Sequence, residues 1–407
     1  MAEERPGRLT TQQVADRLGV KVETVYAYAS RGQLSSERAP DGKGSTFDAR
    51  EVAELARRGR RPAARPAAGD PVEVRTGLTL IEGGRLHYRG RDAVALAERY
   101  GFEAAVGWLW GIGTDPGARF RLPPEAAVAL HRAAEALPAG IRLPDRLRVA
   151  VAVAAATDPL RFDLREQAVL ATGAGLVAGL VEGLPRTAPD PGPEATLAAR
   201  LWSRLASGAP GPGSVACLDR ALVLLLDHEL AVSTVAVRVA ASARAHPYAV
   251  VSAGLGATDG PLHGAASSLA HRMLGEVLAG GAVPVIGEHL RTGRPVPGLG
   301  HRLYPDGDPR AAALLAAVRR LDGGERVVAA VEEVARVAGG QPGARPNVDL
   351  ALAALAHTAG LPADAGEVVF AVARTPGWLA HAVEEYGEEP LRMRARATYT
   401  GPRPQAE

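Results

Sequence analysis

Apolar residues recur at helical spacing along most of the chain from Val72 onward, with polar residues between them. Windows rich in alanine and leucine with this spacing occupy residues 91–100, 124–137, 147–157, 196–207, 220–245 and 310–321. Loops rich in glycine and proline separate the windows. Residues 77–90 instead alternate in the manner of strands around a Gly-Gly pair, which predicts a hairpin. The pattern therefore predicts a mainly α protein.

Residues 1–56 carry a shorter pattern of their own. Apolar positions predict one short helix ended by Gly19 and a second over Val22–Ala29, with Tyr26 among its apolar residues. A short wing and a third helix from Asp48 are expected to follow. Two helices around a glycine turn are typical of a helix-turn-helix.

This N-terminal pattern resembles the small winged helix-turn-helix modules of excisionase-type and related regulators. The resemblance implies possible contact with DNA, for which the groove-facing candidates are Thr24, Tyr28, Ser30 and Arg31. A helical hairpin that packs on another surface and never meets DNA would give the same pattern. Residues 57–71, rich in arginine, proline and alanine without apolar periodicity, are expected to be a linker.

Composition and charge narrow the class of protein. The chain has 407 residues, 47% hydrophobic and 23% charged, as in ordinary globular proteins of two or three domains. No apolar run approaches the roughly 20 residues that span a bilayer, and the N-terminus lacks the apolar core of a signal peptide. The single Cys217 excludes an internal disulfide and a cysteine metal site. We therefore expect a cytoplasmic protein.

Positive charge comes almost entirely from arginine, although the net charge is only +2. A guanidinium group keeps its charge when it is buried and holds carboxylates or phosphates with two donors. The composition therefore favours anionic ligands, and the slight basic excess lies in the N-terminal part.

Three histidines have unusual neighbours. His228 follows an apolar run and stands between Asp227 and Glu229, where the pattern predicts burial. His263 lies among small residues in "GPLHGAAS", and His301 lies in a loop rich in glycine and proline. Buried ionisable groups are costly unless they are paired or used. Each histidine alone is more often structural, but three in such settings favour a functional site.

A carboxylate and an arginine lie further along the chain. Asn347 is expected to cap a helix, which places Asp349 in the first turn, where the helix dipole favours the carboxylate. Arg374 ends an apolar run and precedes a Thr-Pro pair that predicts a break. A plain stabilising Asp in the first turn of a helix would look the same.

Six motifs occur in an order and spacing similar to those of the citrate synthase family: "DHELAVST", "GPLHGAAS", "GLGHRLYPDGDPRA", "PNVDLALA", "FAVARTPGWLAH" and "RARATYTG". The resemblance covers about residues 72–402. It implies an all-helical fold with a large domain over residues 72–262 and 356–407 and a small domain over residues 263–355. The segment 1–56 lies outside it and looks like a module appended in some bacterial relatives.

The resemblance also implies catalytic roles. The chain would carry out the Claisen condensation of acetyl-CoA with oxaloacetate and hydrolyse the thioester to citrate and CoA. His263 would stabilise the enolate, Asp349 would remove the methyl proton, and His301 would polarise and protonate the oxaloacetate carbonyl. A helix that begins just after His263 would help to keep its imidazole neutral.

Binding roles and partners follow from the same resemblance. His228, Arg310 and Arg374 would bind the carboxylates of oxaloacetate and citrate, and Arg394 would reach the neighbouring subunit's site in a homodimer. No metal and no tightly bound cofactor is implied, because coenzyme A enters as a thioester substrate.

Two departures leave the substrate open. Ala231 and Ser267 stand where many members of the family carry Asn. A 2-methylcitrate synthase that uses propionyl-CoA would share the same motifs. A DNA-binding regulator that senses metabolites with this fold is a second alternative, although the intact Asp349 counts against a role in sensing alone.

Overall fold

The computed structural model describes residues 8–18, 20–30, 32–38, 44–58, 74–192, 194–339, 344–395 and 398–401. The chain divides into two compact units, one formed by Met1–Glu73 with Arg396–Glu407 and the other by Val74–Ala395. Arg57 and Arg58 of the expected linker lie in a helix, and its residues 59–71 lie outside the described residues.

The first unit is a small three-stranded sheet with three helices. Its elements in chain order are β1 (Arg8–Thr10), α1 (Thr11–Leu18), α2 (Val22–Ser30), β2 (Ser36–Arg38), β3 (Ser45–Asp48) and α3 (Ala49–Arg58). The antiparallel strands lie in the order β1-β3-β2. The core is formed by Val14, Ala15, Val25, Leu34, Phe47 and Val52. The three helices lie where the sequence predicts them, while β1 was not expected.

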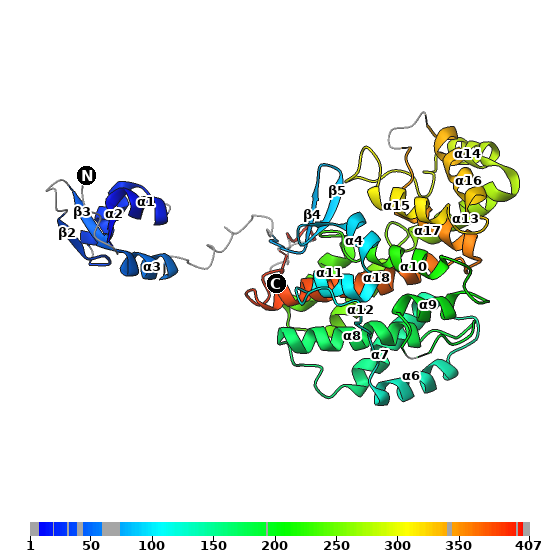
Figure 1. Ribbon diagram of the computed structural model, residues 1–407, viewed down its shortest axis with the longest axis horizontal. Helices are drawn as coiled ribbons and strands as arrows, with labels where there is room; N and C mark the ends of the chain where they lie inside the picture. Colours follow the sequence, from blue (N-terminus) through cyan, green and yellow to red (C-terminus); the bar gives the residue numbers. More distant parts are fainter. Residues whose placement is uncertain are drawn as a thin grey trace, which may run out of the picture. The chain divides into compact units, whose positions relative to one another are not determined.

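The second unit is almost entirely helical, which confirms the predicted class (Figure 1). It begins with β4 (Thr79–Glu82), β5 (Arg85–Tyr88) and β6 (Arg91–Asp92), paired in that order. Its first helices are α4 (Ala93–Arg99), α5 (Phe102–Leu109), α6 (Pro124–Ala136), α7 (Leu143–Thr157), α8 (Glu166–Glu182), α9 (Leu197–Leu205), α10 (Ser214–Leu224), α11 (Val232–Ser242) and α12 (Pro247–Thr258). The later helices are α13 (Ala266–Gly280), α14 (Ala282–Arg291), α15 (Pro309–Val318), α16 (Gly324–Val337), α17 (Val348–Ala359) and α18 (Ala365–Tyr386).

The predicted hairpin is confirmed. Strands β4 and β5 pair from Thr79 to Tyr88, and the turn is made by Gly83 and Gly84 at φ +57° and +72°. Positive φ at both turn residues is the geometry that two-residue hairpin loops prefer, and glycine adopts it without strain.

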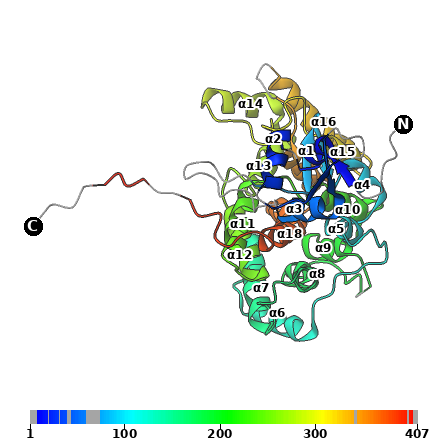
Figure 2. The same cartoon turned by 90° about the vertical axis from the view of Figure 1, so that its left-hand side faces the viewer.

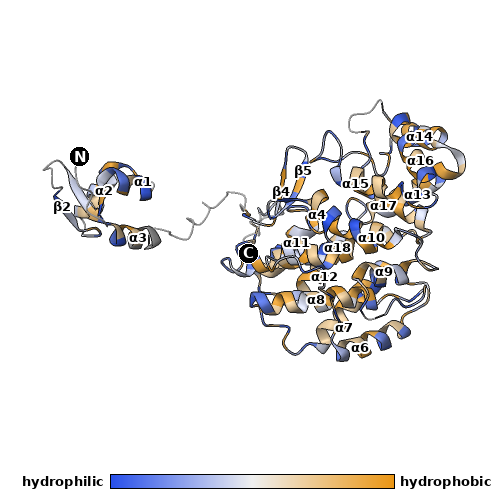
Figure 3. Cartoon of the chain, viewed as in Figure 1, coloured by the Kyte–Doolittle hydropathy of each residue, from blue (hydrophilic) through white to orange (hydrophobic). Residues whose placement is uncertain are grey.

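One long helix, α18, forms the centre of the second unit and packs against α7, α8, α11 and α12 (Figure 1). Almost every one of its residues is buried from Ala365 to Ala382. Outer helices have one apolar face only: α6 buries just Ala126 and Leu130, and mixed colours run along it in Figure 3. A helix that is apolar on all sides is expected at the centre of a large core.

The break expected at Thr375–Pro376 is absent, because α18 continues through Pro376 to Tyr386. Proline at 376 cannot donate to the Val372 carbonyl, but neighbouring groups make hydrogen bonds beyond those of the helix backbone. The Thr375 hydroxyl donates to the Ala371 carbonyl at 2.8 Å, and Trp110 Nε1 donates to the Pro376 carbonyl at 3.0 Å. Burial on every side then holds the helix together.

The window 220–245, which reads as one helical run, is interrupted. Helix α10 ends at Leu224, α11 begins at Val232, and the connecting loop contains Asp227 and His228. Glu229 in this loop has φ +51°, a backbone conformation that a continuous helix of L-residues does not contain. Apolar periodicity alone does not reveal such a break, because the loop is buried like the helices around it.

Candidate active site

The loop between α10 and α11 places two ionisable groups in the interior. Asp227 is fully buried, and its Oδ2 accepts hydrogen bonds from the Thr79 hydroxyl and from His381 Nε2. Arg238 donates to His381 Nδ1 at 3.0 Å, so this nitrogen must be unprotonated and Nε2 must carry the proton. The start of the loop is therefore fixed by a buried chain of hydrogen bonds.

His228 extends from this loop to the loop before α15. Its Nε2 lies 2.9 Å from the Tyr304 hydroxyl, and its ring centroid lies 5.0 Å from that of His301. Burial, followed by the charges of Arg310 and Arg374, holds the pKa of His228 well below its usual range. His228 is therefore a neutral imidazole.

His301 has a defined tautomer. The Leu303 amide donates to His301 Nδ1 at 3.1 Å, so the proton of the neutral ring lies on Nε2. Burial and the nearby Arg310 charge lower the pKa of His301. Its Nε2–H is consequently available as a donor to a ligand.

His263 lies in a tight turn whose backbone bonds run from the His263 amide to the Gly260 carbonyl and from the Ala266 amide to the His263 carbonyl. Its Nε2 is 2.8 Å from the Ser233 hydroxyl, whose oxygen accepts from Trp378 Nε1 at 3.3 Å and whose proton is therefore available to His263 Nε2. The ring nitrogen Nδ1 has no contact among the described residues and is left for a ligand.

Burial and the Arg374 charge lower the pKa of His263 to about 4, so the ring is neutral near pH 7. The sequence predicted a helix starting directly after His263 as the cause. Helix α13 begins three residues later, at Ala266. Burial and a neighbouring guanidinium account for the neutral ring instead.

Two buried arginines face this region. Arg374 donates through Nε to the Leu225 carbonyl at 2.9 Å, while its Nη1 has no hydrogen-bond partner among the described residues. Arg310 forms a two-fold ion pair with Asp308, through Nε at 3.0 Å and Nη2 at 2.8 Å. A buried guanidinium with an unused donor is costly to the fold unless a ligand accepts from it.

Asp349 lies in the first turn of α17, as the sequence predicts. Asn347 is the N-cap, and its side chain accepts from the Asp349 amide at 3.0 Å. Burial is the main cause that raises the pKa of Asp349 to about 6; the charge of Asp308 adds to it and that of Arg310 opposes it. A carboxyl group with this pKa can take up and return a proton near neutral pH.

The structure thus brings six of the predicted site residues into one region. His228, His301 and Arg310 surround Tyr304, with ring or guanidinium distances of 4.9 to 5.5 Å. His263 and Arg374 flank Phe370, at 5.3 Å and 4.7 Å from its ring centroid. Asp349 belongs to the same region, because the charge of Arg310 lowers its pKa.

Arg394 is the exception. It lies after α18 in an exposed segment, and its backbone amide bonds the Leu391 carbonyl at 3.2 Å. Among the described residues its side chain has no partner and no contact with the other candidate residues.

Sequence reasoning missed several residues at the site: Ser233, Tyr304, Asp308, Phe370 and Trp378. All five lie within the motifs quoted above, and Phe370 precedes Arg374 by one helical turn. No sequence pattern marks the roles of Ser233 and Asp308, because these roles depend on burial and on hydrogen bonds that only the fold creates.

The two departures from the family pattern occupy structural positions next to the site. Ala231 is the N-cap of α11 and offers no side-chain hydrogen bond there. Ser267 is buried, and its hydroxyl donates to the Gly264 carbonyl at 3.2 Å. The side chains at both positions are small.

In the first unit, the DNA-contact candidates differ in exposure. Ser30 is exposed and Thr24 is half-buried, while Arg31 lies outside the described residues. Tyr28 packs partly against the core, whereas Tyr26, which the pattern placed among the apolar residues, is 48% exposed. The expected orientations of the two tyrosines are therefore exchanged.

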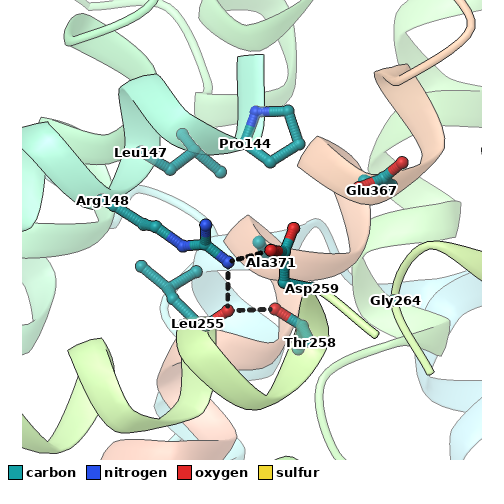
Figure 4. A pocket seen from close by; sticks show the side chains of 9 residues that line it. All are labelled: Pro144, Leu147, Arg148, Leu255, Thr258, Asp259, Gly264, Glu367 and Ala371. Atoms are coloured by element: carbon teal, nitrogen blue, oxygen red, sulfur yellow. Dashed lines mark hydrogen bonds and ion pairs between the residues drawn. The ribbon is translucent and has the colours of Figure 1, made fainter. Parts of the chain in front are cut away.

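A second feature lies behind the His263 turn, where a small pocket is bounded by Pro144, Leu147, Arg148, Leu255, Thr258, Asp259, Gly264, Glu367 and Ala371 (Figure 4). Arg148 points toward Asp259, 3.3 Å away, and toward the Leu255 carbonyl (Figure 4). Arg142 bonds both Asp259 at 3.3 Å and Glu367 at 2.9 Å. Arg148 and the neighbouring Arg142 are both paired with carboxylates, which leaves no unpaired cation among the described residues of this pocket.

Two connections of the chain lie at this ionic cluster, one after α12 and one before α18. Asp259 ends α12, just before the chain passes to α13, and Asp364 stands where the chain returns to α18. The Asp364 carboxylate accepts from the Leu143 amide at 3.0 Å. Asp259 and Asp364 therefore attach both connections to the first turns of α7.

Comparisons with known proteins show the family to which the chain is similar. The family model described as "Citrate synthase, C-terminal domain" matches residues 70–396. "Citrate synthase 2" of Bacillus subtilis is 38% identical over 200 residues, 47% of this chain and 53% of that protein. "2-methylcitrate synthase 2" of Corynebacterium glutamicum is 33% identical over 199 residues, 48% and 52% of the two chains. The chain thus spans about half the length of these curated relatives.

The fold has solved counterparts. A citrate synthase from Thermotoga maritima is 24% identical with a TM-score of 0.67, over 84% of this chain and 97% of that one. A citrate synthase from Thermoplasma acidophilum, solved with carboxymethyl coenzyme A and oxaloacetate, is 22% identical with a TM-score of 0.67, over 83% and 96%. These likenesses concern the fold.

Proposed function

The chain belongs to the citrate synthase family, and from that premise we propose that it condenses acetyl-CoA with oxaloacetate and hydrolyses the product to citrate and CoA. The observation that carries the proposal is the buried Arg374, whose Nη1 has no partner among the described residues. Together with Arg310 and the neutral His228 it offers donors that a dicarboxylate would satisfy.

The first chemical step is proton removal. The Asp349 carboxylate takes a proton from the methyl group of acetyl-CoA, and the electron pair moves to the thioester oxygen to form an enolate. His263 donates through Nδ1 to this oxygen, in the tautomer in which its Nε2 accepts from the Ser233 hydroxyl. A neutral donor fixed in a buried site stabilises the enolate without losing its own proton.

Carbon–carbon bond formation follows. The enolate carbon attacks the keto carbon of oxaloacetate, and its carbonyl oxygen gains the proton of His301 Nε2. The tautomer set by the Leu303 amide places a donor on that nitrogen. Water then hydrolyses the citryl thioester and releases CoA, so no covalent enzyme intermediate is needed.

The acyl donor is the finer part of the proposal. Relatives named as citrate synthases and as 2-methylcitrate synthases both match the chain. Ala231 and Ser267 have smaller side chains than the Asn that many family members carry, which leaves propionyl-CoA as the alternative donor.

Thiol release from acetyl-CoA and from propionyl-CoA, each with oxaloacetate, tests the proposal and ranks the donors. We expect turnover by the intact chain and a loss of at least about a thousandfold in Asp349→Ala, since general base catalysis and the enolate step fail together. Absence of thiol release with either donor would rule the proposal out.

We also propose that the enzyme is a homodimer. Helices α7, α11 and α12 lie side by side at one edge of the unit (Figure 2). On α11 the residues Val232, Val235 and Val239 share one face and are 69%, 38% and 46% exposed. A second copy that covers this face would also give the exposed Arg394 a neighbouring site to reach.

A second candidate function is DNA binding by the first unit. Its own small core, and a β2–β3 hairpin whose sheet packs against α1, favour this. Gel retardation at low salt, with the intact chain and with residues 1–60 deleted, tests it. Retention of DNA only by the intact chain would support a regulator; no retention at low salt would exclude it.

A further inference from the structure

The buried Asp308 contacts two separate parts of the candidate site. As the N-cap of α15, its Oδ1 accepts from the Arg310 amide and from Arg310 Nε, each at 3.0 Å. Its Oδ2 accepts from Arg310 Nη2 at 2.8 Å and from the Val348 amide at 3.1 Å. Both carboxylate oxygens are thus fully used, and the residue is 3% exposed.

The Val348 amide belongs to the helix that carries Asp349. The first amides of a helix have no partner within it and need a cap. In α17 the Asn347 side chain accepts from the amides of Asp349 and Leu350, and Asp308 accepts from that of Val348. The position of Asp349 is therefore tied to Arg310 through one carboxylate.

The charges of Asp308 and Arg310 also act on the Asp349 carboxyl group. Beyond burial, the described charged groups that act on Asp349 are Arg310, which lowers its pKa, and Asp308, which raises it. Neutralising Asp308 would remove a like charge and leave the Arg310 charge unopposed. Both changes make the Asp349 carboxylate a weaker proton acceptor.

We propose that Asp308 is a positioning residue that holds Arg310 and the first turn of α17 as one unit and keeps Asp349 a strong proton acceptor. The inference rests on the proposed function, in which Asp349 is the base. Both oxygens of Asp308 are taken up by protein donors, so the residue acts through Arg310 and the first turn of α17.

Asp308→Asn tests the proposal, since the amide oxygen still caps α15 while the charge is lost. Carboxyl ¹³C NMR of protein labelled at aspartate follows the Asp349 titration, with Asp349→Asn used to assign the signal. We expect the midpoint to fall from about 6 in the unaltered protein by roughly one to two pH units in the variant. The acid limb of kcat/KM should move in the same direction.

Asp364→Asn is the matched control, because Asp364 also accepts from a helix-start amide but is not among the groups that shift the pKa of Asp349. Its midpoint should stay near that of the unaltered protein. An unchanged Asp349 midpoint in Asp308→Asn, or an equal shift in Asp364→Asn, overturns the proposal.

Val348→Pro separates the hydrogen bond from the charge and remains informative if Asp308→Asn does not fold. Proline suits the first position of a helix, and Asn347 before it is extended at φ −104° and ψ 179°. We expect an unchanged Asp349 midpoint and a several-fold lower kcat. An unchanged kcat would contradict the positioning role.

Failure of the proposed condensing activity can be told apart from failure of the Asp308 proposal. If the unaltered protein releases no CoA while Asp308→Asn still shifts the Asp349 midpoint, the electrostatic inference holds and the condensing activity is wrong. If turnover is present and the Asp349 midpoint does not move in Asp308→Asn, the condensing activity holds and the electrostatic inference is wrong.

Discussion

Arg374 brings a positive charge into the interior with an incomplete set of partners. Its Nε is bonded to the Leu225 carbonyl, its guanidinium lies 4.7 Å from the Phe370 ring centroid, and its Nη1 has no acceptor among the described residues. Burial lowers its pKa, while the nearby Asp227 raises it in part. A bound carboxylate would restore the missing acceptor and the charge balance.

Replacing Arg374 should therefore weaken binding more than folding. In Arg374→Met we expect KM for oxaloacetate to rise about a hundredfold, the equivalent of a lost charged hydrogen bond of about 2–3 kcal/mol. Unfolding in urea should show little loss of stability, because an apolar side chain removes a buried charge. Arg374→Lys, which keeps the charge without the planar fork, should recover part of the binding; normal KM in Arg374→Met would refute the carboxylate role.

Asp349 gives a prediction on stability against pH. Its pKa of about 6 in the folded protein lies above the usual 3.8, so the folded state prefers the protonated form. Stability from this group is complete below pH 4 and is lost as the pH rises through 6. We expect Asp349→Asn to be more stable than the unaltered protein at pH 8, by about 1–3 kcal/mol, and equal to it near pH 4.

Urea unfolding at the two pH values measures this difference. The same variant should be inactive, so the prediction describes a residue that lowers stability in exchange for reactivity. A difference that is the same at both pH values would contradict it.

At the scale of elements, the sequence predicted helices well where one face is apolar and poorly where everything is buried. The N-cap at Asn347 and the hairpin at Gly83–Gly84 were found because local chemistry determines them. The loop holding His228 and the continuation of α18 through Pro376 were missed. Both depend on tertiary partners, such as Thr79 and Trp110, that lie more than 140 residues away.

Close approach of α18 to the loop of His228 explains Gly377. A Cβ there would lie 2.3 Å from the Leu226 carbonyl oxygen and 3.0 Å from Asp227 Oδ1. Gly377→Ala should displace the loop, with a loss of about 1–3 kcal/mol in stability and at least tenfold in kcat/KM for oxaloacetate. Thermal unfolding and steady-state kinetics measure the two effects.

Gly287 in α14 is the control, because a Cβ at this position has open space. Gly287→Ala should be neutral or stabilising by up to about 1 kcal/mol. Similar behaviour of the two variants would show that helix propensity, and not contact with the loop, explains the effect.

At the scale of the whole molecule, the sequence predicted a small N-terminal domain, a linker, an enzyme with a large and a small domain, and a homodimer. The structure divides the chain after Glu73, while the predicted domain bounds and the split into a large and a small domain stay predictions. Arg394 could not be placed by reasoning on one chain, since its predicted role needs a second subunit. Motif patterns and spacing identify candidate site residues within one chain. Contacts between subunits depend on surface shape and exposure, which the sequence pattern indicates only weakly.

The homodimer is tested at the apolar face of α11. A charged residue in the middle of a buried interface is strongly unfavourable, so Val235→Glu should yield monomers in size-exclusion chromatography with light scattering. If Arg394 acts across the interface, activity should fall with dissociation and return at high protein concentration. A monomeric but fully active variant would contradict the shared site.

The connections at Asp259 and Asp364 are both attached to α7, and this attachment would guide any closing movement of the site. Helices α13 to α17 leave and rejoin the rest of the unit at Asp259 and Asp364, so a rigid rotation of this segment has its axis near those two points. His263 follows Asp259 closely and would move little. Asp349 lies at the far end of α17, roughly 15 Å along the helix from the connection at Asp364. It would sweep a longer arc, so that a small rotation at α7 would change the distance between Asp349 and His263 by more than it moves His263 itself.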